Sequence, residues 1–276
     1  MKFTKILSLA LAVLTVGAVA LTGCAKTDEK ANGVHDANQT ANTETNDTET
    51  NDTETKVLTM ATNAEFPPFE FLEGEEIKGV DIDLANAICD YLGYTLEITN
   101  IDFDAALTGA ATGKYDVAIA GITANDERRK NMNFSKDYFT ASQSIIVTAD
   151  SEIATAADLE GKTVSCQEGT TGEQYLLDNG YSIQSFKTGA EAITALVTGK
   201  CDAVVIDGEV ARALSEKQEG KTVVLDEALT KENYAIALKK GNDELTAKID
   251  EAIDAIIADG TLYTIFDNYG LTYDVE

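Results

Sequence analysis

Ala111-Thr-Gly113-Lys-Tyr-Asp116-Val-Ala-Ile119-Ala-Gly121 is the stretch that decides the fold, because its pattern recurs as Val197-Thr-Gly199-Lys-Cys-Asp202-Ala-Val-Val205-Ile-Asp207. Each copy has the pattern of a helix end, a glycine that stops the helix, a lysine and a short apolar strand. The apolar runs are too continuous for a half-exposed antiparallel strand, so they favour parallel strands that are covered on both faces. The repeat therefore predicts two similar α/β lobes.

The residues around each copy extend it into a β-α-β-α-β unit. In the first unit we expect strands at 56–61, 95–99 and 115–120, helices at 79–92 and 102–112, and a loop at 63–71. In the second unit we expect strands at 161–166, 183–186 and 202–206, and helices at 170–179 and 190–198. Thr170 and Glu173 have the spacing of a capping box at the start of one helix. The alternative, a chance reuse of Gly-Lys before a strand, would not produce two units of matched order.

Two further apolar strands, at 144–148 and 234–238, lie outside both units. We place the crossings between lobes near 138–142 and 230–234. Residues 57–138 and 234–276 then form lobe 1, which ends in helices at 243–259 and 262–269, and residues 139–233 form lobe 2. Two crossing strands make a hinge, which lets the lobes close on a ligand.

Residues 1–23 have the pattern of a signal peptide. Lys2 and Lys5 precede an apolar run at 6–21, and small residues then lead to Cys24. The ending Leu21-Thr22-Gly23-Cys24 resembles the lipobox of bacterial lipoproteins, which implies cleavage before Cys24 and a diacylglycerol on its sulfur. An ordinary secretory signal followed by an unrelated cysteine is the alternative.

Residues 24–56 have the composition of a disordered acidic tether. Thr43-Glu-Thr-Asn-Asp47 repeats as Thr48-Glu-Thr-Asn-Asp52, and so polar a segment buries too little apolar surface to fold. The whole chain has a formal net charge of −27. This charge argues against binding to nucleic acid or directly to an anionic membrane, so we expect the lipid on Cys24 to be the membrane link.

The cysteines other than Cys24 are odd in number, namely Cys89, Cys166 and Cys201. Cys166 ends one predicted strand and Cys201 begins another, so parallel neighbours would keep their sulfurs apart. We expect three buried thiols without a disulfide.

The candidate site lies at the carboxyl ends of the repeated strands, Gly121 and Asp207, where parallel sheets bind ligands. Past Gly121 the chain offers the hydroxyl of Thr123 and, one helical turn later, a guanidinium that can hold a carboxylate. Arg128 and Arg129 point about 100° apart on a helix, so only one of them can face the cleft, and we choose Arg128. The alternative is that both arginines are exposed helix charges.

The second lobe adds an anion site and an acid. A glycine-containing turn after Gln167 leads to a helix N-terminus at Thr170 and Thr171, whose free amides suit an anion. Asp207 suits an ammonium group, although it could instead cap the helix that follows. Groups for both a carboxylate and an amine describe an α-amino acid as the ligand.

Aromatic residues follow the first and second strands of lobe 1. Phe66 and Phe103 could enclose a ligand side chain, and a cationic one would gain about 0.5–2 kcal/mol from their π faces. Asn63 and Glu65, beside Phe66, could contact its polar end. Both phenylalanines could instead belong to the core.

Four motifs resemble the family 3 extracellular solute-binding proteins, the polar amino-acid receptors of ABC importers. They are Ala61-Thr-Asn-Ala-Glu-Phe66-Pro-Pro-Phe-Glu-Phe71, Gly79-Val-Asp-Ile-Asp-Leu84, Gly121-Ile-Thr-Ala-Asn-Asp-Glu-Arg128 and Asn133-Phe-Ser135 with Tyr138. The resemblance implies a two-lobed type II periplasmic-binding-protein fold that closes on one amino acid. It implies that Arg128 grips the α-carboxylate with help from Thr123, Thr170 and Thr171. It further implies that the Gly121 carbonyl and Asp207 hold the α-amino group, between Phe66 and Phe103.

Departures from the family pattern bear on specificity. Asn63 replaces a frequent aspartate and Thr171 a frequent glycine, while Gln167 occupies a position that often contacts the ligand side chain. A cationic or amide side chain is favoured over an acidic one. The resemblance further implies a monomeric lipoprotein on the outer face of the bacterial membrane, which delivers its ligand to a permease.

An enzyme on the same fold, such as a dehydratase, and a sensory amino-acid-binding lipoprotein are the alternatives. The domain lacks histidine, because His35 lies in the tether, and it lacks nucleophile motifs such as Gly-x-Ser-x-Gly. We therefore expect no catalytic residues, no cofactor and no metal.

Overall fold

The computed structural model describes residues 56–273. The predicted signal peptide, Cys24 and the tether up to residue 55 lie outside the described residues. Between residues 56 and 273, no helix has the length and apolar character needed to cross a membrane.

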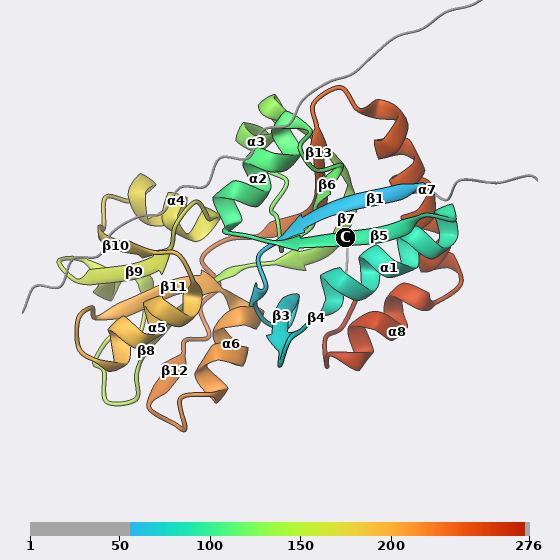
Figure 1. Cartoon of the computed structure of the whole chain (residues 1–276). Helices are drawn as coiled ribbons and strands as arrows, with labels where there is room; N and C mark the ends of the chain where they lie inside the picture. Colours follow the sequence, from blue (N-terminus) through green and yellow to red (C-terminus); the bar gives the residue numbers. More distant parts are fainter. Residues whose placement is uncertain (1–55, 274–276) are drawn as a thin grey trace, which may run out of the picture. The chain divides into compact units, whose positions relative to one another are not determined.

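The first five-stranded sheet combines parallel and antiparallel strands in the order β5-β1-β6-β13-β7 (Figure 1). β1 is parallel to β5 and β6, whereas β13 is antiparallel to β6 and β7. The strands are β1 (Val57–Thr62), β5 (Thr95–Asn100), β6 (Val117–Ala118), β7 (Met132–Ala141) and β13 (Glu232–Lys239). The accompanying helices are α1 (Val80–Leu92), α2 (Phe103–Thr112), α3 (Asp126–Asn131), α7 (Asp243–Ala258) and α8 (Thr261–Asn268).

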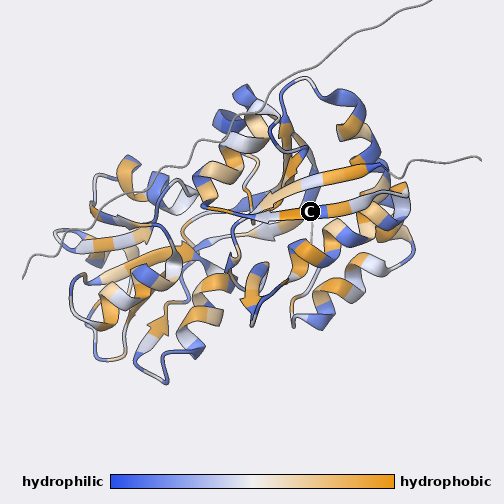
Figure 2. Ribbon diagram, in the orientation of Figure 1, coloured by the Kyte–Doolittle hydropathy of each residue, from blue (hydrophilic) through white to orange (hydrophobic). Residues whose placement is uncertain are grey.

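Both faces of the first sheet are covered, as the continuous apolar runs require. Val117 and Ile119 belong to the cluster formed with α1, α7 and α8. Ala118 and Ala120 belong to a separate cluster with residues of α2. Successive residues of a strand point to opposite faces, so helices on both sides leave no face for polar residues. Figure 2 shows the resulting concentration of hydrophobic residues on β1.

The second sheet repeats this plan in the order β10-β9-β11-β8-β12, with β9 parallel to β10 and β11. β8 is antiparallel to β11 and β12. The strands are β8 (Gln143–Thr148), β9 (Thr163–Gln167), β10 (Ser182–Phe186), β11 (Ala203–Asp207) and β12 (Thr222–Val224). The helices are α4 (Thr171–Asp178), α5 (Gly189–Val197) and α6 (Gly208–Glu216), with a 3-10 turn, η1 (Ala156–Leu159).

The prediction of two similar α/β lobes is confirmed, because the repeated strands occupy equivalent places. β6 and β11 each lie between the parallel first strand of their own sheet and an antiparallel strand, β13 or β8. We call the elements of the first sheet lobe 1 and those of the second sheet lobe 2. The chain passes from one to the other where β7 ends at Ala141 and β8 begins at Gln143, and it returns through β13.

Two local predictions were wrong. β6 spans only two residues rather than 115–120, because only Met60 and Ala61 of β1 pair with it. The segment 63–71, expected as a loop around Pro67 and Pro68, contributes β2 (Glu65–Phe66) and β3 (Glu70–Glu73). These two strands and β4 (Glu76–Lys78) form a small antiparallel sheet.

The thiols of Cys89, Cys166 and Cys201 are buried and free. Burial raises the pKa of Cys89 and of Cys166 to about 11. Ser165 Oγ lies 3.1 Å from the sulfur of Cys201. Protonated thiols in apolar surroundings are unreactive, so these cysteines have a structural role.

Candidate ligand-binding site

A cavity lies where the carboxyl ends of the parallel strands of both lobes meet, and it encloses about 380 Å³ of empty space, counted to its mouth. Its lining brings together all but one of the predicted ligand-binding residues: Asn63, Phe66, Phe103, Gly121, Thr123, Arg128, Gln167, Thr170, Thr171 and Asp207. Four further residues complete the lining: Glu70, Gln143, Ile206 and Tyr234.

Glu65 is the predicted residue that the structure does not bring into the cavity. It is exposed, whereas its neighbour Phe66 is buried. The two residues form β2, and successive side chains of a strand point to opposite sides. Because Phe66 faces the cavity, Glu65 faces solvent.

Arg128 links the two lobes across the cavity. Its guanidinium donates one hydrogen bond to the carbonyl of Thr123 in lobe 1 and another to that of Gly169 in lobe 2, each 3.0 Å long. Its central carbon lies 5.5 Å from the centroid of the Phe103 ring. Burial lowers the pKa of Arg128 while the Glu232 carboxylate raises it, but a guanidinium stays charged throughout. A fixed positive charge therefore lines the cavity.

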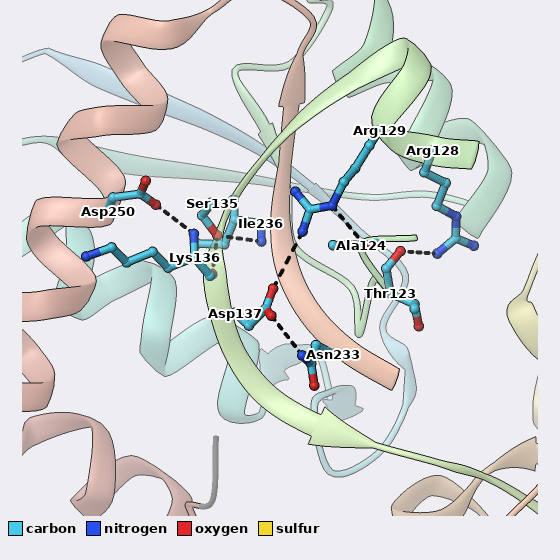
Figure 3. A network of polar contacts seen from close by, with 10 residues as sticks. All are labelled: Thr123, Ala124, Arg128, Arg129, Ser135, Lys136, Asp137, Asn233, Ile236 and Asp250. Carbon is cyan, nitrogen blue, oxygen red and sulfur yellow. Dashed lines mark hydrogen bonds and ion pairs between the residues drawn. The ribbon is translucent and has the colours of Figure 1, made fainter. Parts of the chain in front are cut away.

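Arg129 points away from the cavity, as the helical spacing predicts. Figure 3 shows its guanidinium directed toward Ala124 and Asp137, while that of Arg128 lies beside Thr123. Arg129 Nε donates to the carbonyl of Ala124 over 3.1 Å, and its Nη2 lies 3.7 Å from an oxygen of Asp137. The two neighbouring arginines thus serve different surfaces.

The N-terminus of α4 faces the cavity with backbone groups rather than hydroxyls. Thr170 Oγ1 donates to the carbonyl of Gln167 and accepts from the amide of Glu173, so it caps the helix. The predicted reciprocal capping box is incomplete, because the Glu173 carboxylate accepts from Gly169 N instead of Thr170 N. The first amides of a helix have no intrahelical acceptor, which leaves those of Thr171 and Gly172 for an anion.

Gly169 lies against lobe 1 so closely that no side chain would fit. Its φ of +75° is a left-handed conformation, and a Cβ there would lie 1.8 Å from Asp104 Oδ1. The turn before α4 therefore contacts the start of α2 when the lobes are together.

Asp207 both caps a helix and lines the cavity, so the two alternatives stated for it are compatible. It is the N-cap of α6 and accepts from Glu209 N over 3.1 Å. Its other oxygen accepts a hydrogen bond from Tyr234 Oη on β13. The side chain is 1% exposed, and burial raises its pKa to about 7. A cationic ligand group would favour the ionised form.

A pair of amides spans the two lobes on another side of the cavity. Gln167 Nε2 donates to Asn63 Oδ1 over 3.0 Å, and Asn63 Nδ2 donates to the carbonyl of Ile101. Gln167 Oε1 is buried and has no hydrogen-bond donor. Buried acceptors are almost always paired, so this atom is available to an N–H group of a ligand.

Glu70 is the most unusual residue that sequence reasoning missed. Its side chain is 0% exposed, and neither carboxyl oxygen has a hydrogen-bond donor. Burial, followed by the charge of Asp81, raises its pKa well above the usual range. The one available signal was an acidic residue between the apolar residues Phe69 and Phe71.

The other missed residues lie next to predicted features. Ile206 precedes Asp207 in β11, Gln143 begins β8, and Tyr234 lies on the returning strand β13. Gly121 explains the place of Tyr234, since a Cβ at Gly121 would lie 2.8 Å from the Phe66 ring and 3.2 Å from that of Tyr234. The position of the strands along the hinge, rather than any motif, brings these residues to the site.

A polar cavity between two α/β lobes joined by crossing strands defines a solute-binding protein with the type II periplasmic-binding-protein fold. The chain belongs to the bacterial extracellular solute-binding proteins, family 3, whose pattern matches residues 58–272. It is thus a solute-binding protein and not an enzyme.

Named relatives are similar over most of their length. The arginine-binding extracellular protein ArtP of Bacillus subtilis (strain 168) is 30% identical over 213 residues, which are 75% of this chain and 83% of ArtP. The L-cystine-binding protein TcyJ of Escherichia coli (strain K12) is 29% identical over 77% of this chain and 82% of TcyJ. The structure of the arginine-, lysine-, histidine-binding protein ArtJ from Geobacillus stearothermophilus is similar with a TM-score of 0.75 and 34% identity, over 79% of this chain and 96% of ArtJ.

Proposed function

We propose that this protein captures a polar L-amino acid outside the cell and delivers it to the permease of an ABC importer. The observation that carries the proposal is the cavity itself, which has Arg128 for a carboxylate and Asp207 for an ammonium group. The two residues come from different lobes, so an amino acid that binds both favours the closed arrangement over an open one.

The carboxylate has a set of donors from both lobes. Arg128 can turn its N–H groups from the carbonyls of Thr123 and Gly169 to the ligand. The amides of Thr171 and Gly172 add the partial positive charge of a helix N-terminus. We assign no carboxylate contact to the hydroxyl of Thr170, because it already donates to the carbonyl of Gln167.

The excess of acceptors in the cavity supports a side chain that carries N–H groups. Arg128 is the one cationic residue in the described lining, whereas Glu70 and Gln167 contribute buried oxygens without donors. A guanidinium, ammonium or amide group can satisfy such oxygens, while a ligand carboxylate would repel them. The names of ArtP and ArtJ, which bind arginine, agree with this preference.

Export and anchoring complete the proposal. We assign residues 1–23 as a signal peptide, Cys24 as a lipidated anchor and 24–56 as a tether. Residues 57–138 and 234–276 then act as lobe 1 and 139–233 as lobe 2 of a monomeric receptor. The net charge of −27 supports a lipid rather than the protein surface as the contact with an anionic membrane.

A thermal-shift screen of the domain against the twenty amino acids and L-cystine tests the proposal. A ligand that binds only the folded protein raises its melting temperature in proportion to the logarithm of its excess over Kd. We expect a shift of several degrees with L-arginine or another side chain rich in N–H donors, and none with L-aspartate or L-glutamate. Melting temperatures that no amino acid changes would contradict the proposal.

A further inference from the structure

Glu232 is a buried carboxylate that connects the two lobes without lining the cavity. It is the first residue of β13, where the chain returns to lobe 1, and it is 8% exposed. One of its oxygens accepts hydrogen bonds of 2.6 Å from both Thr123 Oγ1 in lobe 1 and Thr171 Oγ1 in lobe 2. Only the closed arrangement allows one oxygen to reach both hydroxyls.

The same carboxylate also connects the two crossings of the hinge. Its second oxygen accepts a hydrogen bond of 2.7 Å from Thr230 Oγ1. Thr230 Oγ1 in turn accepts from the backbone amide of Gln143, the first residue of β8, over 2.9 Å. Gln143 Nε2 lies 3.3 Å from Thr171 Oγ1, to which it donates. Glu232 is therefore the centre of a polar network that joins both crossings to the start of α4.

The network fixes the direction in which the two hydroxyls point. A threonine hydroxyl has a single hydrogen. Both Thr123 and Thr171 give that hydrogen to Glu232, so neither can donate to a ligand carboxylate while the network is intact. Thr123 Oγ1 can offer the cavity only lone pairs, which suit an ammonium group.

We propose that Glu232 is a positioning residue that latches the closed form and turns the Thr123 and Thr171 hydroxyls away from the ligand carboxylate. The proposal rests on the proposed function, since the closed form is the one that holds an amino acid. Hydrogen bonds to a charged group in a buried site are stronger than those between neutral groups, so the latch slows reopening once the lobes have met. It has little part in the encounter with a ligand, which precedes closure.

Stopped-flow measurement of ligand dissociation and association tests the latch. The probe is L-arginine, or L-cystine if that alone raises the melting temperature. We expect Glu232→Ala to raise the dissociation rate constant about tenfold or more and to change the association rate constant less than about twofold. Glu216→Gln, which removes an exposed negative charge on α6, is the matched control and leaves both constants unchanged.

A double-mutant cycle separates the latch from general damage to the fold. Thr171→Val removes the cross-lobe hydrogen bond and keeps the carboxylate, so it raises the dissociation rate constant in the wild type. In the Glu232→Ala background the same change has an effect of less than about twofold, because its partner is already absent. If Glu232→Ala does not fold, as judged by circular dichroism, Thr171→Val alone carries the test.

The proposal is overturned if L-arginine or L-cystine binds the wild type but leaves the folded Glu232→Ala and Thr171→Val proteins at the wild-type rate. It is equally overturned if the two changes act additively. Failure of the wild type to bind any amino acid is a different result, because it contradicts the proposed function and not the hydrogen-bond network.

Discussion

Replacing Arg128 by alanine is expected to abolish amino-acid binding, with a loss of affinity of at least about 100-fold. Removing one partner of a buried charge pair typically costs 2–5 kcal/mol or more, and each 1.4 kcal/mol is tenfold in Kd. Arg128 is the one cationic side chain in the described lining of the cavity, and it contacts both lobes. Its loss removes the carboxylate partner and a bridge between the lobes together.

Arg129→Ala is the matched control for this prediction. The side chain of Arg129 is 44% exposed, and its partners are Ala124 and Asp137 outside the cavity (Figure 3). We expect its affinity, measured by calorimetry, to stay within about twofold of the wild type. Equal losses in the two variants would show that Arg128 acts through the charge or stability of α3 rather than through the ligand.

Asp207→Asn is expected to weaken amino acids by about 100-fold and their deaminated analogues far less. The aspartate is 1% exposed, so its pairing with an ammonium group is shielded from water. Asparagine keeps the size of the side chain and an oxygen for the Glu209 amide. Calorimetry with an amino acid and its deaminated analogue compares the two losses, and similar values would show that Asp207 does not contact the amine.

The pH dependence of affinity gives an independent control on Asp207. Burial raises its pKa to about 7 in the empty protein, so below pH 7 an arriving ammonium group must displace a proton. We expect the wild-type affinity to fall as the pH is lowered from 8 to 5. Asparagine cannot titrate, so the Asp207→Asn protein should show a weaker dependence. A steeper fall in the variant would assign the effect to another group, such as Glu70 or Asp81.

The sequence was most informative where one local pattern determines one element. The copies at 111–121 and 197–207 place β6 and β11 correctly, because a helix stop followed by an apolar run depends little on distant residues. The residues after those strands, Gly121 and Asp207, line the cavity because the carboxyl ends of parallel strands share one edge of a sheet.

Contacts that depend on how the lobes meet could not be predicted from local patterns. Tyr234 and Glu232 lie on β13, and their partners Asp207 and Thr171 belong to the other lobe. No spacing along the chain relates these positions. The direction of the Thr171 hydroxyl therefore depends on Glu232, about which the sequence carries no signal.

The side chain of Glu65 illustrates a second limit. A two-residue strand is too short to show an alternating pattern, so the sequence could not indicate which of Glu65 and Phe66 faces inward. The pairing of β2 with β3 decides it.

Calorimetric titration of the wild-type domain with an amino acid and with its decarboxylated and deaminated analogues tests the central claim most directly. For L-arginine, the analogues are agmatine and 5-guanidinopentanoate. If both ends of the α-amino acid are held, one by Arg128 and the other by Asp207, L-arginine binds at least about 100-fold more tightly than either analogue. Affinities within about threefold of one another would contradict this, because they would show that the closed cavity does not hold both ends.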